Sequence, residues 1–147
     1  MPLSVYLDVC CLQRPFDDLS QVRVRLEAEA VALILSYVEE NRISLYSSEV
    51  IEYEVNQITN QRRANRVQAI IMLASRRIIS DEIIVARAAE ITNLGFAALD
   101  ALHLACAETA KASVFLTTDD KLLKRTLRLR AQLSISTANP LTWLQET

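Results

Sequence analysis

The chain has 147 residues, of which 51% are hydrophobic and 23% charged, so it can fold as one domain with a buried core and is unlike a disordered chain. One glycine and three prolines leave few tight turns, which argues against a β-sandwich or β-barrel and favours long helices. The net charge of −2 provides no global basic field for nucleic acid, although an acidic cluster that holds cations would mask basic residues near it.

Apolar runs and helical spacing alternate along the chain. Strands are predicted at residues 4–8, 43–47, 77–80 (a strand or an extended link), 114–117 and 134–136. Helices are predicted at residues 20–41, 49–58, 60–75, 81–93, 97–111 and 120–129, with a loop or short helix at 9–18 and a short helix after Pro140. This alternation predicts a single α/β domain over residues 1–147, with a parallel sheet covered on both faces.

Polar residues mark several of the predicted helix ends. Ser20 and Ser48 each precede a helix and are predicted to cap it, and Gly95 follows the helix at 81–93, where a left-handed C-cap is needed. In the helix at 20–41, helical spacing is kept by Leu26, Ala30, Leu33 and Tyr37.

Asp8 ends the first predicted strand. Val5, Tyr6 and Leu7 form a short apolar run typical of a strand buried on both faces. In an open α/β sheet, ligands bind beyond the carboxyl ends of the strands, so Asp8 is expected at the edge of such a crevice. A carboxylate in that place indicates metal or acid–base chemistry.

Glu54 is the one acid of its helix that points inward. At about 100° per residue from Glu49, the inward face is defined by Ile51, Val55 and Ile58, and Glu54 lies within this apolar arc. A buried carboxylate is unfavourable unless it pairs or binds a cation, so Glu54 is a candidate site residue.

Asp100 lies in the first turn of a helix that is apolar on almost every side, residues 97–111. It is therefore expected to face the same site, although an acid in a first turn also interacts favourably with the helix dipole without any further role. His103, one turn later, is expected either beside the site or in the core with a satisfied hydrogen bond.

Asp119 follows the strand at 114–117 as Asp8 follows the first strand. We favour Asp119 as the inward acid and Asp120 as solvent-facing or supporting, although either can instead cap the next helix. Thr117 or Thr118 is expected to orient the site through its hydroxyl.

Four separated carboxylates without a matching histidine or cysteine set favour a hard cation, Mg²⁺ or Mn²⁺. Such an ion neutralises a phosphodiester and activates water for in-line attack, which indicates phosphodiester hydrolysis. The chain has one histidine and no CxxC pair, which argues against zinc.

Cysteine usage and hydropathy bear on location. The three cysteines, Cys10, Cys11 and Cys106, are odd in number and follow no recognisable signal peptide, so reduced thiols and a cytoplasmic protein are expected. Apolar stretches are interrupted by Glu or Arg before they reach membrane-spanning length, so no membrane association is expected.

Four segments in order resemble the PIN-domain family, which includes the VapC-like ribonuclease toxins of toxin–antitoxin pairs. They are residues 6–8 (YLD), 47–54 (SSEVIEYE), 99–105 (LDALHLA) and 115–119 (FLTTD). The resemblance implies a three-layer α/β/α sandwich and a Mg²⁺- or Mn²⁺-dependent endonuclease for single-stranded RNA. It also implies a homodimer and a small antitoxin partner.

By motif position, the resemblance makes Asp8, Glu54, Asp100 and Asp119 the catalytic acids, with the metal held by Asp8, Asp100 and Asp119. The chain departs from the family at Val9-Cys10, where members commonly carry Thr and then Asn or Ser. This departure motivates an alternative function, a weak or inactive PIN-like module that binds RNA or protein.

Basic residues form a stripe after Asp119. The stripe consists of Lys121, Lys124, Arg125 and Arg128, at helical spacing and opposite Leu122, Leu123 and Leu127. These basic residues are either a solvated face or contacts to an RNA backbone. Arg14 is a second candidate for phosphate contact, with pairing to Asp17 or Asp18 as the alternative. For Arg62, Arg63 and Arg66 the same two alternatives apply, a solvated face or contacts to RNA, and contact with a partner is a third.

Overall fold

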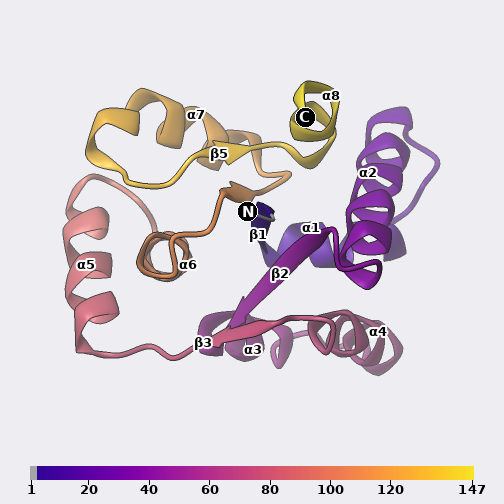
Figure 1. Ribbon diagram of the computed structural model, residues 1–147, viewed down its shortest axis with the longest axis horizontal. Coiled ribbons are helices and arrows are strands. Elements are labelled where there is room, and N and C mark those ends of the chain that lie inside the picture. Colours follow the sequence, from indigo (N-terminus) through magenta and orange to yellow (C-terminus); the bar gives the residue numbers. More distant parts are fainter. Residues whose placement is uncertain (1–2) are drawn as a thin grey trace.

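The computed structural model describes residues 3–147 and contains a five-stranded sheet between two helical layers (Figure 1). The strands are β1 (Leu3–Leu7), β2 (Ile43–Ser48), β3 (Arg76–Ile78), β4 (Val114–Leu116) and β5 (Thr137–Ala138). They lie in the order β3-β2-β1-β4-β5, and every neighbouring pair is parallel.

Eight α-helices accompany the strands within residues 3–147. They are α1 (Val9–Gln13), α2 (Val22–Glu39), α3 (Glu49–Val55), α4 (Gln61–Ile71), α5 (Glu82–Asn93), α6 (Ala98–Thr109), α7 (Asp120–Arg128) and α8 (Pro140–Glu146). Figure 1 shows α5 and α6 on one side of the sheet and α1 and α2 on the other. The predicted three-layer α/β/α fold with a parallel sheet is thus confirmed.

The core is centred on β1 and β4, the two most enclosed strands. Val5, Tyr6 and Leu7 are completely buried, and so are Phe115 and Leu116 on the neighbouring strand. Each such side chain contributes roughly 2–3 kcal/mol through burial, which explains why these short apolar runs form the middle of the sheet.

The carboxyl ends of β1, β2 and β4 meet at one edge of the sheet. The Asp8 N–H donates to the Leu116 carbonyl (2.9 Å), so the residues that follow β1 and β4 lie side by side. Ser48 ends β2 at the same edge and caps α3 as predicted, because its Oγ accepts from the Ile51 N–H (3.0 Å). Parallel pairing therefore directs three chain segments towards one place.

Several element boundaries differ from the sequence prediction. The last strand lies at Thr137–Ala138 and not at 134–136, because the Ser134 N–H is bonded to the Glu108 carboxylate (2.7 Å) and is unavailable to the sheet. Helix α4 ends at Ile71, short of the predicted residue 75. Gly95 has φ of +107° and ends α5 as predicted.

The start of α2 also differs from the sequence prediction. The Ser20 N–H is bonded to Asp18 (3.0 Å), and the residue that caps α2 is Gln21, whose side chain forms no capping bond. Of the residues that keep helical spacing, Ala30 is buried, whereas Leu26 and Leu33 are exposed to 38% and 44%. The buried face carries Glu27, Ala28, Ala30, Val31, Ile34 and Val38.

Within residues 3–147, none of the helices combines the length and the apolar character needed to cross a lipid bilayer.

Candidate functional site

Asp8 lies at the junction of β1 and α1 and is almost fully buried, with 7% exposure. Its Oδ1 accepts the Val9 N–H (2.8 Å), and its Oδ2 accepts the Thr117 hydroxyl (2.8 Å) and the Cys10 thiol (3.4 Å). Burial raises the pKa of Asp8, an effect that the nearby His103 and the Thr117 hydrogen bond oppose. The carboxylate is therefore held rigidly by its neighbours.

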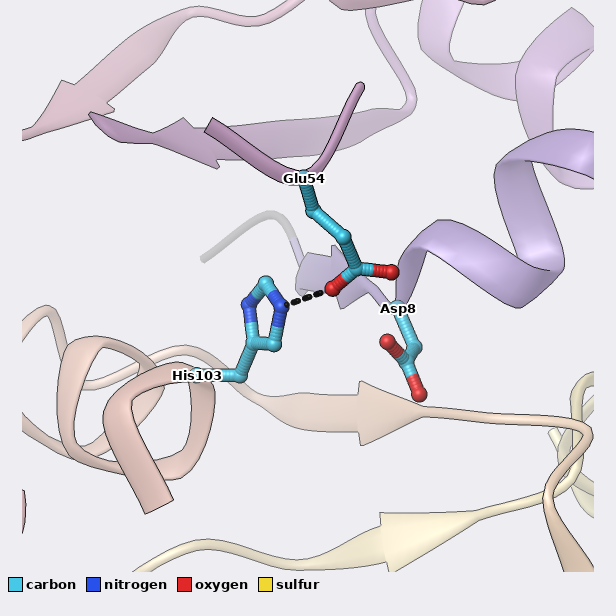
Figure 2. A group of neighbouring side chains, drawn as sticks. All are labelled: Asp8, Glu54 and His103. Carbon is cyan, nitrogen blue, oxygen red and sulfur yellow. Dashed lines mark hydrogen bonds and ion pairs between the residues drawn. The ribbon is translucent and has the colours of Figure 1, made fainter. Parts of the chain in front are cut away.

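Glu54 of α3 faces the site as predicted and is bonded to His103 of α6 (Figure 2). His103 Nε2 lies 2.8 Å from Glu54 Oε1, and Nδ1 lies 2.7 Å from the Tyr6 hydroxyl, which in turn lies 2.7 Å from Ser48 Oγ. An ionised Glu54 only accepts, so Nε2–H donates to it. Nδ1 then accepts from Tyr6, and Tyr6 accepts from the Ser48 hydroxyl.

His103 thus satisfies both expectations for it, since it is a core histidine, 1% exposed, and it also touches a site acid. The sequence signal was its place one turn after Asp100 in an otherwise apolar helix.

Asp100 lies in the first turn of α6, and its pKa is affected by the other three acids. The pKa of Asp100 is raised to about 6, first by burial and then by the charges of Asp8, Asp119 and Glu54, while His103 lowers it. Asp100 thus lies close enough to Asp8, Asp119 and Glu54 for their charges to act on it, although the group whose ligand atoms lie within 4.8 Å of one another contains only Asp8, Glu54 and His103.

Asp119 and Asp120 face different ways. Asp119 precedes α7, and its Oδ1 accepts the N–H groups of Lys121 (3.0 Å) and Leu122 (3.2 Å). Asp120 accepts from the guanidinium of Arg23 on α2 (2.6 Å) and is exposed. The geometry therefore distinguishes the two acids and leaves Asp119 as the one that acts on Asp100.

Thr117 connects two of the site acids. Its buried hydroxyl donates to Asp8 and accepts the Asp119 N–H (3.1 Å). Thr118 is buried beside it, and its N–H donates to Cys10 Sγ (3.4 Å). Cys10 thus supplies polar contacts at the position where the family commonly has Asn or Ser.

The donor set fits a hard divalent cation. Asp8, Glu54 and His103 each place a potential ligand atom within 4.8 Å of the others. Both nitrogens of His103 are already hydrogen-bonded, which leaves carboxylate oxygens as the available ligands. The raised pKa of Asp100 has the same implication, because burial and then the neighbouring carboxylates disfavour its ionised form, which a bound cation would stabilise.

The basic residues predicted to contact phosphate differ in whether their side chains already bind other groups of the protein. Lys121 and Lys124 are exposed on α7, whereas Arg125 donates to the Gly95 carbonyl (2.7 Å). The Arg14 guanidinium binds Asp17 (3.1 Å), one of the two acids predicted to pair with it, and also Glu27 (2.8 Å). Leu127 of α7 is 52% exposed and does not belong to the inward face predicted for it.

Comparison with known proteins agrees with this fold. The model of the PIN domain family matches residues 5–127. No curated protein sequence matches the chain significantly.

Two solved structures share the fold. A chain of VapBC2 from Rickettsia felis, bound to a DNA fragment from its promoter, superposes with a TM-score of 0.58 at 12% identity over 93% of this chain and 98% of that one. A chain of FitAB bound to an IR36 DNA fragment gives a TM-score of 0.58 at 22% identity over 93% and 95% of the two chains. The family model matches most of this chain, and the candidate site lies at the expected edge of the sheet. The chain therefore belongs to the PIN-domain family.

Proposed function

We propose that this protein is a Mg²⁺- or Mn²⁺-dependent endoribonuclease that hydrolyses single-stranded RNA. The observation that carries the proposal is the cluster at the carboxyl edge of the sheet, in which Asp8 and Glu54 place carboxylate oxygens within 4.8 Å of each other. The charges of Asp8, Asp119 and Glu54 also raise the pKa of Asp100, which supports its place beside this cluster. The typical nuclease activity of PIN domains supports it further.

In this proposal Asp8, Asp100 and Asp119 hold the cation, and Glu54 completes the acidic cluster. A bound Mg²⁺ or Mn²⁺ would neutralise the phosphodiester and activate water for in-line attack. Thr117 fixes Asp8 and the Asp119 backbone, and His103 fixes Glu54, so the carboxylates are oriented before substrate binds. Lys121 and Lys124 are proposed to contact RNA phosphates beside Asp119.

The test is incubation of purified protein with mixed-sequence single-stranded RNA and Mn²⁺, followed by EDTA. Cleavage is expected with Mn²⁺ and should stop with EDTA. Asp8→Asn and Asp100→Asn should abolish it while the fold is retained, whereas the matched control Asp120→Asn should cleave normally, since Asp120 is bonded to Arg23. Full activity of Asp8→Asn or Asp100→Asn would refute the proposed mechanism.

A second candidate function is a PIN-like module that binds RNA or protein with little or no turnover. Val9 favours it, because this buried apolar side chain offers no polar group to Asp8. RNA binding that persists without cleavage at any Mn²⁺ concentration would select this alternative.

We also propose a small antitoxin partner, a homodimer and a cytoplasmic location for the single domain. The motif resemblance to VapC-like toxins supports both the partner and the dimer, and the fold shared with VapBC2 and FitAB supports the partner. The free thiols of Cys10, Cys11 and Cys106 support a reducing compartment.

A further inference from the structure

A polar groove leads from the acid cluster across α4. A hollow of about 540 Å³ begins at Glu54 and is also lined by Gln13, Asn60 and Arg63. A second hollow, of about 420 Å³, shares Asn60 and Arg63 with the first. It continues along α4 to Phe16, Arg62 and Arg66. Because the two hollows share lining residues, they form one path, here called the α4 groove.

The half of the α4 groove that lies away from Glu54, here called the far half, carries positive charge that no acid in the described part of the chain neutralises. Arg63 is fixed in its wall, since its guanidinium donates to Asp17 (2.7 Å) and to the Phe16 carbonyl (2.6 Å). Arg62 and Arg66 are exposed, and neither forms an ion pair with any acid of residues 3–147. Arg66 lies 5.6 Å from the centre of the Phe16 ring, a cation–π contact that holds its guanidinium at the groove.

We propose that the α4 groove binds the sugar–phosphate backbone of single-stranded RNA next to the cleaved bond, with Arg62 and Arg66 as phosphate contacts. This inference rests on the proposed function, because it places the scissile phosphate at the acid cluster that includes Glu54. Guanidinium groups recognise phosphates through paired N–H donors, and the amide side chains in the groove suit ribose hydroxyls.

Two features favour RNA over a protein segment as the occupant. The one carboxylate in the far half, Asp17, is already neutralised by Arg63 and Arg14, so the lining attracts anions. The lining of this half is dominated by arginines and offers few apolar anchors of the kind on which protein interfaces depend.

The test compares Arg62→Gln/Arg66→Gln with a matched control, Arg42→Gln/Lys111→Gln. The control removes the same charge from exposed residues that precede β2 and β4, at the opposite edge of the sheet. Binding of a fluorescent single-stranded oligoribonucleotide is measured in the Asp8→Asn chain, so that the RNA remains intact. Cleavage with Mn²⁺ is measured in the otherwise wild-type chain, on a long RNA and on one too short to reach the far half.

The groove variant should bind RNA about ten-fold or more weakly, and the slope of log K against log salt should fall by about 1.4, the value for two single-strand phosphate contacts. Its kcat/KM should fall on the long RNA and stay unchanged on the short one, and the control should behave as wild type in both assays.

Affinity and salt slope equal to those of the control would overturn the inference and assign the arginines to a protein partner. That result differs from failure of the proposed function, in which the wild-type chain cleaves neither RNA. In that event the binding assay alone decides, and a chain that does not bind RNA overturns the inference as well.

Discussion

Asp100 shows at the scale of one residue what the clustering of acids does. Among residues 3–147 no lysine or arginine pairs with it, and three other carboxyl groups raise its pKa above the effect of burial. The folded chain therefore holds the Asp100 proton more tightly than the unfolded chain, and ionisation of Asp100 lowers stability in the absence of metal.

We predict that Asp100→Asn is more stable than wild type in EDTA at pH 8, by about 1 kcal/mol after allowance for partial solvent exposure. The raised pKa makes the Asp100 contribution to stability fully present below about pH 4 and lost as pH rises through about 6, so the two chains should converge in acid. Urea denaturation at several pH values measures this difference. A difference that is constant across pH would contradict it.

The buried hydrogen-bond chain from Ser48 to Glu54 provides a second test at this scale. Tyr6→Phe removes one hydroxyl and leaves Ser48 Oγ and His103 Nδ1 without this partner, so we expect a loss of about 1–2 kcal/mol in unfolding free energy. Tyr46→Phe is the control, because its hydroxyl has no hydrogen-bond partner in the part of the chain that the structure describes. Equal stability of both variants in thermal denaturation would show that the Tyr6 bonds contribute nothing.

At the scale of elements, Glu27 joins three parts of the chain. This carboxylate of α2 is 1% exposed and binds Arg14 (2.9 Å), Arg23 (3.2 Å) and Asn139 (2.6 Å), the residue that caps α8. Arg14 follows α1, Arg23 lies one turn before Glu27 in α2, and Asn139 precedes α8. Glu27 therefore connects the segment after α1 with the C-terminal helix.

We predict that Glu27→Leu destabilises the protein by about 3 kcal/mol, because it leaves Arg14 partly buried without its main partner. Glu29→Leu, an exposed position on the same helix, should change stability little. Chemical denaturation of the two variants measures the difference. A Glu27 variant as stable as the Glu29 variant would contradict this account.

Glu27 also shows where prediction from sequence reaches its limit. Asp8, Glu54 and Asp100 were predicted to converge because each stands at a strand end or within an apolar helical arc, and local periodicity reveals that. Glu27 resembles a surface charge locally, and its partners Arg14 and Asn139 lie 13 and 112 residues away. The position of β5 was missed for the same reason, since Glu108 withdraws the Ser134 backbone from the sheet.

At the scale of the whole molecule, charge is separated although the net value is only −2. Carboxylates gather at the carboxyl edge of the sheet, and the arginines of α4 line a groove that starts there. An acidic centre that requires a cation, flanked by a basic path, is an arrangement that suits a polyanionic substrate.

The most direct test of the shared acid site is a Mn²⁺ titration of the wild-type chain, Asp8→Asn, Asp100→Asn and Asp120→Asn, followed by calorimetry at neutral pH. The account predicts that wild type and Asp120→Asn bind Mn²⁺ alike and that the other two variants lose the binding. Unchanged Mn²⁺ affinity in Asp8→Asn and Asp100→Asn would contradict it, because the acids would then hold no common ion.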